Sequence, residues 1–319
     1  MDRNPLEPLL DRSDVVLLDG GLATELEARG FDLDDDLWSA RFLLEKPEAI
    51  RRVHLDYLEA GADCIVTSSY QATIEGFEKK GIGKREAVDL LRRSVQLAQA
   101  ARDEFWGSPA NRSGRVRPLV AASVGPYGAY LADGSEYTGA YDLDEDGLVE
   151  FHRERWDVLA TAGADLLACE TIPSLPEALA LGRLLHQTKD ARAWFSFTCG
   201  DGSHISDGTP IADVIGRLDG HKRVVAVGVN CTPPRLIPDL IRKVRRATHK
   251  PVVVYPNSGE RYDATSNRWE RSEDTIELSE TCLEWRRLGA QLIGGCCRTR
   301  PADIRKMSQK LRQRRMPLS

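Results

Sequence analysis

Gly294-Gly295-Cys296-Cys297 follows the short apolar run at 291–293, near the C-terminal end of the chain. Two glycines free the backbone from strand geometry, so two successive thiols, which would point to opposite faces of a regular strand, can turn toward one point. Cys231 lies 65 residues earlier and also closes an apolar run, at 224–230. Three thiols at the ends of two strands indicate a zinc site with one open position. Burial as small apolar side chains is the competing interpretation, because the spacing lacks the CxxC pattern of compact zinc motifs.

The bulk properties fit one large cytoplasmic enzyme. The 319 residues suffice for two average domains or for a single barrel, and no Ser/Gly/Pro linker divides them. A net charge of −5 gives no overall attraction to nucleic acid or to an anionic membrane. We find no secretory leader and no run of about 18 apolar residues. Seven cysteines, an odd number, argue against a secreted disulfide framework. We expect a monomer or weak homo-oligomer without nucleic-acid or membrane partners.

Short apolar runs rich in β-branched residues alternate with longer amphipathic stretches along the whole chain. Their apolarity is continuous rather than alternating, as in strands that are covered on both faces. Helical patterns lie between them; Pro47 opens one of these patterns, and Gly61 ends it. The eight predicted strands are 15–18, 64–67, 119–123, 165–169, 193–198, 223–229, 251–255 and 291–293.

A repeated junction supports strict alternation of helix and strand. The segments 60–63, 162–165 and 288–291 each place glycine between a predicted helix and the next strand, where a left-handed helix cap is expected. Eight such units predict a (β/α)8 TIM barrel, an α/β fold, as a single domain over 1–319 with its core at about 13–314. The alternative is an open doubly wound sheet. That fold usually has a GxGxxG phosphate turn after its first strand, where this chain has Asp-Gly-Gly.

In a barrel of this kind the chemistry lies at the C-terminal ends of the strands, because the loops there converge on one mouth. Nearly every reactive residue outside the predicted helices falls at such an end. This convergence favours zinc binding over simple burial of the thiols. The residues concerned are Asp19, Gly20, Gly21, Ser68, Tyr70, Tyr127, Glu170, Asn230, Cys231, Asn257, Cys296 and Cys297.

The ligand set also limits the reaction. Zinc held by three thiolates has a net charge of −1 and is a poor Lewis acid for hydrolysis, yet it binds an incoming thiol and stabilises it as thiolate at neutral pH. A free thiol, with a pKa of about 8.5, is only a few per cent ionised at neutral pH. The site therefore favours alkylation of sulfur. No histidine is well placed for a Ser/His or Cys/His pair, so a hydrolase is disfavoured.

These residues resemble the homocysteine S-methyltransferase family. The resemblance rests on Asp-Gly-Gly after the first strand, Val-Gly-Val-Asn-Cys at 227–231 and Gly-Gly-Cys-Cys at 294–297, and it covers roughly 15–304. It implies a zinc-dependent barrel that passes a methyl group from S-methylmethionine or S-adenosylmethionine, both sulfonium donors, to L-homocysteine, giving methionine. The segments most similar to the bacterial and plant members that use these donors are 37–40, 125–137 and 255–260.

The resemblance also implies roles for individual residues. By that likeness Cys231, Cys296 and Cys297 bind one Zn²⁺ per chain, and Asp19 and Glu170 hold the amino group of homocysteine. Two carboxylates that face a substrate ammonium would form charge-assisted hydrogen bonds and fix its orientation over the metal. A turn or helix cap is the alternative role for Asp19.

Other rim residues are expected to complete substrate binding. Backbone amides near Gly20, Gly21 and Ser68 would receive the substrate carboxylate. Cys199 also ends a strand and is expected to be a non-ligand thiol. Aromatic faces attract a sulfonium as they do other cations, although loop packing is the alternative role for any one ring. The rim aromatics are Tyr70, Tyr127, Tyr130, Tyr137, Tyr141 and Trp38, of which Tyr70 and Tyr127 join the predicted substrate-binding set with Asn230 and Asn257.

Two alternatives stay open from the sequence. The first is a homocysteine methyltransferase that uses betaine or methylfolate as its methyl donor. Both are disfavoured because betaine-using relatives have a longer C-terminal arm and cobalamin-dependent ones have large extra domains. The second is a barrel without catalytic activity, in which 294–297 forms a redox-active vicinal disulfide or a metal store. Metal analysis of a cysteine variant separates the second alternative from an enzyme.

Overall fold

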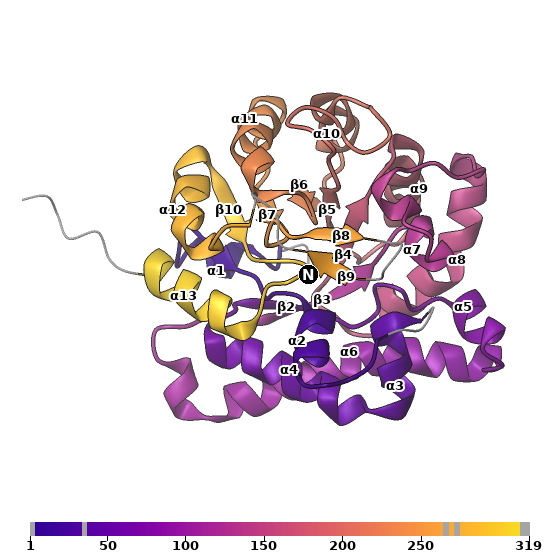
Figure 1. Ribbon diagram of the computed structural model, residues 1–319, viewed down its shortest axis with the longest axis horizontal. Helices are drawn as coiled ribbons and strands as arrows, with labels where there is room; N and C mark the ends of the chain where they lie inside the picture. The colour runs from indigo at the N-terminus through magenta and orange to yellow at the C-terminus, as the bar shows by residue number, and fades with distance from the viewer. Residues whose placement is uncertain (1–3, 34–36, 264–267, 271–274, 313–319) are drawn as a thin grey trace, which may run out of the picture.

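Eight parallel strands form a sheet that closes into a barrel, with helices around its outside (Figure 1). The computed structural model describes residues 4–33, 37–263, 268–270 and 275–312. Neighbouring strands follow the order β1-β10-β7-β6-β5-β4-β3-β2, and a parallel bridge between Leu18 and Cys64 joins the two ends of this order. The predicted TIM barrel is therefore confirmed, and the open sheet is excluded. The barrel strands are β1 (Val16–Leu17), β2 (Cys64–Val66), β3 (Leu119–Val124), β4 (Leu166–Ile172), β5 (Ala193–Phe197), β6 (Val224–Asn230), β7 (Val252–Tyr255) and β10 (Ala290–Ile293).

Each barrel strand is followed along the chain by one main helix, and short helices occupy several loops. None of the described helices combines the length and the apolarity that crossing a bilayer requires. The main helices are α4 (Pro47–Ala60), α6 (Lys84–Gly107), α8 (Glu145–Thr161), α9 (Leu175–Gln187), α10 (Ile211–Asp219), α11 (Ile237–Ala247), α12 (Leu278–Leu288) and α13 (Pro301–Arg312). The short ones are α1 (Glu7–Leu10), α2 (Leu22–Ala28), α3 (Phe42–Glu45), α5 (Ile74–Lys79) and α7 (Tyr127–Leu131), with 3-10 turns η1 (Trp38–Arg41), η2 (Pro109–Arg112), η3 (Ser135–Tyr137) and η4 (Pro234–Leu236).

The three predicted glycine junctions have the expected backbone. Gly61, Gly163 and Gly289 adopt φ values of 117°, 90° and 109°. These left-handed conformations are strained for residues with a Cβ atom, so glycine allows the helix to stop and the chain to turn directly into the next strand. The repeated junction in the sequence therefore corresponds to a repeated turn in the barrel.

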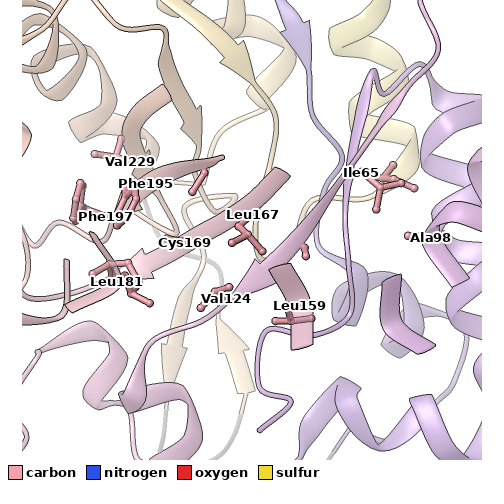
Figure 2. Packing of buried hydrophobic residues seen from close by; sticks show 14 of the residues in the cluster. Ile65, Ala98, Val124, Leu159, Leu167, Cys169, Leu181, Phe195, Phe197 and Val229 are labelled. Carbon is pink, nitrogen blue, oxygen red and sulfur yellow. The ribbon is translucent and has the colours of Figure 1, made fainter. Parts of the chain in front are cut away.

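Buried side chains form two layers on opposite faces of the strands. The outer layer lies between the strands and the helices, and Figure 2 shows part of it, with Leu167 and Phe195 from strands and Leu159 and Leu181 from helices. The inner layer fills the barrel. Its fully buried members are Leu6, Leu9, Val16, Leu18, Cys64, Ala121, Leu166, Ala168, Trp194, Val225, Ala226, Val253, Tyr255 and Leu292.

The inner layer determines which residues can reach the barrel mouth. Side chains alternate between the two faces of a strand, so Leu166 and Ala168 in the interior place Glu170 on the same face, two residues further toward the C-terminal end. The same alternation on β7 places Tyr255 above Val253. Polar side chains thus replace apolar ones where the interior opens.

The structure differs from the predicted elements in two places. Strand β4 continues to Ile172, beyond the predicted end at residue 169, and its pairing with β5 shifts register between Cys169 and Ile172. An antiparallel hairpin of β8 (Arg261–Asp263) and β9 (Arg268–Glu270) follows β7 and was not predicted. Its short polar segments lack the apolar runs by which the other strands were recognised.

Gly228 is a sensitive point of this fold. A Cβ atom added there would lie 1.8 Å from the carbonyl oxygen of Val253 on the neighbouring strand. We expect Gly228→Ala to destabilise the protein by about 3 kcal/mol, because two central strands must separate to admit the methyl group. Gly216→Ala is the matched control: Gly216 is exposed in α10 with open space at its Cβ position, and this variant should gain about 0.5–1 kcal/mol. Denaturant unfolding of both variants measures the difference; equal stabilities would contradict the packing argument.

Candidate active site

Three thiols meet at the C-terminal mouth of the barrel. Cys231 directly follows β6, and Cys296 and Cys297 lie in the loop after β10. The three sulfur atoms lie within 4.8 Å of one another, and those of Cys231 and Cys297 are 3.6 Å apart. A tetrahedral zinc ion with Zn–S bonds of about 2.3 Å needs sulfurs about 3.8 Å apart. The donor set and its spacing therefore fit a metal ion held by three thiolates.

The Gly294-Gly295 pair is required by close packing of this loop. A Cβ atom on Gly294 would lie 2.6 Å from the Cβ atom of Leu18, and one on Gly295 would lie 2.2 Å from Cγ2 of Thr299. The amide of Gly295 donates to the carbonyl of Asp19 at 3.0 Å. The glycines thus let the thiol loop lie directly against the loop after β1, which brings the cysteine pair next to the first acidic residue of the mouth.

Backbone conformation and hydrogen bonds aim the third thiol. Cys231 has φ +47°, an uncommon conformation for a residue other than glycine, and its amide donates to the carbonyl of Tyr255 at 3.2 Å. Hydrogen bonds from the thiols of Cys296 and Cys297 lower the pKa of Cys231 well below its ordinary value, and the side chain of Tyr137 adds to this effect. One sulfur of the cluster is therefore prepared to be ionised, as a metal ligand must be.

Glu170 and Asp19 provide two buried carboxyl groups beside the thiols. Tyr255 donates its hydroxyl to Oε2 of Glu170 at 3.0 Å, and the hydroxyl of Ser123 donates to Oε1. Burial raises the pKa of Glu170 to about 7, although these two hydrogen bonds oppose the shift. Oδ2 of Asp19 accepts from the amide of Val66 at 2.8 Å. Burial raises the pKa of Asp19 well above its ordinary value, and the nearby Glu170 raises it further.

The backbone next to Glu170 is held by Asn230. Thr171 has φ +62°, and its amide donates to Oδ1 of Asn230 at 2.7 Å. Nδ2 of Asn230 in turn donates to Oγ1 of Thr171 at 2.8 Å. Both polar atoms of the Asn230 side chain are therefore engaged in fixing the irregular end of β4. Asn257 similarly uses Oδ1 to accept from the amide of Gly259 at 3.0 Å.

Gly20, Gly21 and Ser68, which are predicted to bind the substrate carboxylate, follow the neighbouring strands β1 and β2. A Cβ atom on Gly21 would come within 2.8 Å of the carbonyl oxygen of Cys296, and one on Gly20 would come within 2.9 Å of that of Thr299. Ser68 is buried, and its hydroxyl oxygen has no hydrogen-bond partner among the described residues. A polar atom shielded from water without a partner calls for a bound water or ligand.

The rim aromatics separate into two groups. Tyr70 and Tyr137 lie in electrostatic range of Cys231. Tyr127 instead packs edge-on against Tyr141 and Phe151, with ring centroids 5.3 and 4.8 Å apart. The ring of Tyr130 belongs to the second group, because it lies tilted against Tyr127 with ring centroids 5.8 Å apart. The side chain of Trp38 lies outside the described part of the chain.

The structure adds supporting residues that sequence patterns did not identify. Ser123 and Tyr255 hold Glu170, but a serine within β3 and a tyrosine ending β7 carry no signal of their own. Arg298 has φ +65° and donates from Nε to Oε2 of Glu260 at 2.6 Å, which fixes the chain just after the thiol pair. Glu136 also interacts electrostatically with Cys231 and Cys297, and its only signal was its place within the similar segment 125–137.

The fold and the site together define a barrel enzyme that can hold a metal ion through three thiolates at its mouth. A model of the homocysteine S-methyltransferase family matches residues 16–311. The chain belongs to this family, so the assignment made from its motifs is confirmed, and with it the enzyme class of methyltransferases.

Individual relatives agree over nearly the full chain. Homocysteine S-methyltransferase YbgG of Bacillus subtilis (strain 168) is 52% identical over 305 residues, which cover 96% of this chain and 97% of the relative. The crystal structure of the homocysteine methyltransferase MmuM from Escherichia coli in its metallated form has a TM-score of 0.87 at 48% identity, covering 96% of this chain and 100% of that one. Its apo form has a TM-score of 0.79 at 42% identity with the same coverage.

Proposed function

We propose that this enzyme transfers a methyl group from a sulfonium donor, S-methylmethionine or S-adenosylmethionine, to the thiol of L-homocysteine, with Zn²⁺ held by Cys231, Cys296 and Cys297. The observation that carries the proposal is the convergence of three thiols within 4.8 Å beside two buried carboxyl groups. Zinc suits this donor set because thiolates are soft ligands that select it.

The residues around the thiols would bind homocysteine by its two ends. Glu170 and Asp19 would accept hydrogen bonds from the substrate ammonium, and an ammonium between them would remove the electrostatic cost of two neighbouring buried carboxylates. The unpartnered hydroxyl of Ser68, with the backbone around Gly20, would receive the substrate carboxylate, whereas the amide of Gly21 already donates to the carbonyl of Thr299 at 3.0 Å. The substrate sulfur would then lie at the thiol cluster. When bound, zinc would supply the stabilisation that keeps this sulfur ionised at neutral pH.

The chemical step is a direct displacement. The thiolate sulfur of homocysteine forms a bond to the methyl carbon as the bond from that carbon to the donor sulfonium breaks, and the electron pair of that bond leaves with the donor sulfur. The donor departs as a neutral thioether, so no acid is needed to protonate it, and the thiol proton of homocysteine is released when the substrate binds. The protein has to align the attacking sulfur, the carbon and the leaving sulfur.

A donor assay tests this function. We expect purified enzyme with zinc to form methionine from homocysteine and S-methylmethionine or S-adenosylmethionine with a kcat/KM at least about 100-fold above that with betaine or methylfolate, because a neutral thioether is a much better leaving group than an amine. The measurement is methionine formation with each donor separately. Preference for betaine or methylfolate would replace the proposed donor class, whereas failure with all four donors would favour the non-catalytic metal or redox barrel.

A further inference from the structure

Glu136 lies in the loop between β3 and α8, which follows the C-terminal end of a barrel strand. It belongs to η3, and its carbonyl oxygen accepts a hydrogen bond from the hydroxyl of Thr198 at 3.2 Å. Its backbone also packs closely on α7, because a Cβ atom added to Gly128 would lie 2.3 Å from the amide nitrogen of Glu136. These contacts fix the position from which the side chain extends.

One carboxyl oxygen of the half-buried Glu136 side chain is shielded from solvent. Its Oε2 atom is buried and has no hydrogen-bond partner among the described residues. Electrostatic interactions couple the group to Cys231, Cys297 and Tyr70, none of which is a cation. Burial raises the pKa of Glu136 to about 7, and the charges of Cys231 and Asp133 raise it further. A shielded carboxylate oxygen among neutral and anionic neighbours is costly unless a cation binds beside it.

We propose that Glu136 binds the positive charge of the donor sulfonium and thereby selects cationic methyl donors. This inference rests on the proposed function. In-line attack requires the methyl carbon to lie about 3–3.5 Å from the accepting sulfur, so the sulfonium sulfur must lie close to the thiol cluster, with which Glu136 interacts electrostatically. The acceptor ammonium has its own carboxylates, Asp19 and Glu170, which leaves Glu136 for the second substrate.

The chemistry predicts which kinetic constant responds. The positive charge of the sulfonium disappears as the methyl group leaves, so a carboxylate beside it stabilises the bound donor more than the transition state. Removing the charge should therefore weaken donor binding without slowing the chemical step. A residue that acted on the metal or on homocysteine would instead change metal content or the KM for homocysteine.

The test is steady-state kinetics of the zinc-loaded enzyme and its Glu136→Gln variant. We expect KM for S-methylmethionine to rise about 10- to 100-fold, with kcat, KM for homocysteine and zinc content each within about threefold of wild type. Glu136→Asp keeps the charge on a shorter side chain, so its KM for S-methylmethionine should lie between those of wild type and Glu136→Gln. Asp142→Asn removes an exposed carboxylate from the following loop and should match wild type.

A simple sulfonium that lacks an amino-acid group tests whether Glu136 binds the sulfonium charge itself or another part of the donor. Dimethylpropylsulfonium should inhibit competitively against S-methylmethionine, and its inhibition constant should rise in Glu136→Gln by a similar factor. An unchanged donor KM, an equal rise in KM for homocysteine, loss of zinc, or inhibition that is absent or insensitive to the variant would each overturn the assignment. Wild-type enzyme that used no sulfonium donor would instead refute the proposed function itself.

Discussion

Replacement of Cys296 by alanine is expected to abolish metal binding and methyl transfer together. Two thiolates remain in this variant, which is one fewer than the three protein ligands of an open zinc site. The thiol of homocysteine then returns to its ordinary pKa and is mostly protonated at neutral pH. We expect zinc to fall from about one per chain to a small fraction, and kcat/KM to fall by roughly three orders of magnitude or more, as when one member of a catalytic unit is removed. Metal analysis and methionine formation on the same sample measure both.

Cys199→Ala is the matched control for the metal site. Cys199 lies just after β5 and is buried, but it is not part of the three-thiol cluster. Its replacement should leave zinc content unchanged and cost only the stability of a small core truncation. Activity retained by Cys296→Ala, or zinc lost equally from both variants, would contradict the assignment of the cluster as the catalytic metal centre.

Replacement of Glu170 by glutamine is expected to weaken homocysteine binding while zinc stays bound. The variant keeps the shape of the side chain and loses its charge, and a hydrogen bond to a charged group contributes about 1.5–3 kcal/mol. KM for homocysteine should therefore rise about 10- to 150-fold. The des-amino analogue of homocysteine, which lacks the ammonium, provides the control: Glu170→Gln should discriminate less than wild type between the two thiols, as competition assays will measure.

The pH dependence of the same variant gives a second test. Because burial raises the pKa of Glu170 to about 7, its carboxyl group becomes protonated in the free enzyme as the pH falls through that value. The group then no longer attracts an ammonium, so KM for homocysteine should rise as the pH falls. Thiol ionisation affects both proteins, so the ratio of variant to wild-type KM isolates the carboxyl group. This ratio should shrink below about pH 7; a constant ratio would exclude Glu170 from ammonium binding.

The strands of this barrel were predictable because each is a short continuous apolar run followed by a loop. Val252–Tyr255 and Cys64–Val66 lie within one residue of their predicted bounds. The end of β4 was less predictable. Glu170 and Thr171 continue the strand because Asn230 satisfies the irregular backbone there, and no local pattern announces a hydrogen bond between residues 59 positions apart. The polar hairpin β8–β9 was missed for a similar reason, since its pairing does not depend on an apolar run.

The thiol cluster followed from the sequence, whereas its surroundings did not. Three cysteines at strand ends converge in any barrel, because the topology alone brings the C-terminal ends together. By contrast, side-chain packing and not topology decides which carboxyl groups remain without a hydrogen-bond partner. One carboxyl oxygen of Glu136 is shielded in a loop whose backbone packs closely against Gly128, a contact that spacing cannot reveal.

The position of β10 between β1 and β7 has a consequence for biosynthesis. Cys231 leaves the ribosome as a lone thiol, and its two partners emerge 65 and 66 residues later, immediately after the strand that completes the ring. A nascent chain interrupted before residue 290 can therefore neither close the ring nor bring the three sulfurs together. A chain that contains all three sulfurs of the cluster therefore also contains all eight strands of the barrel.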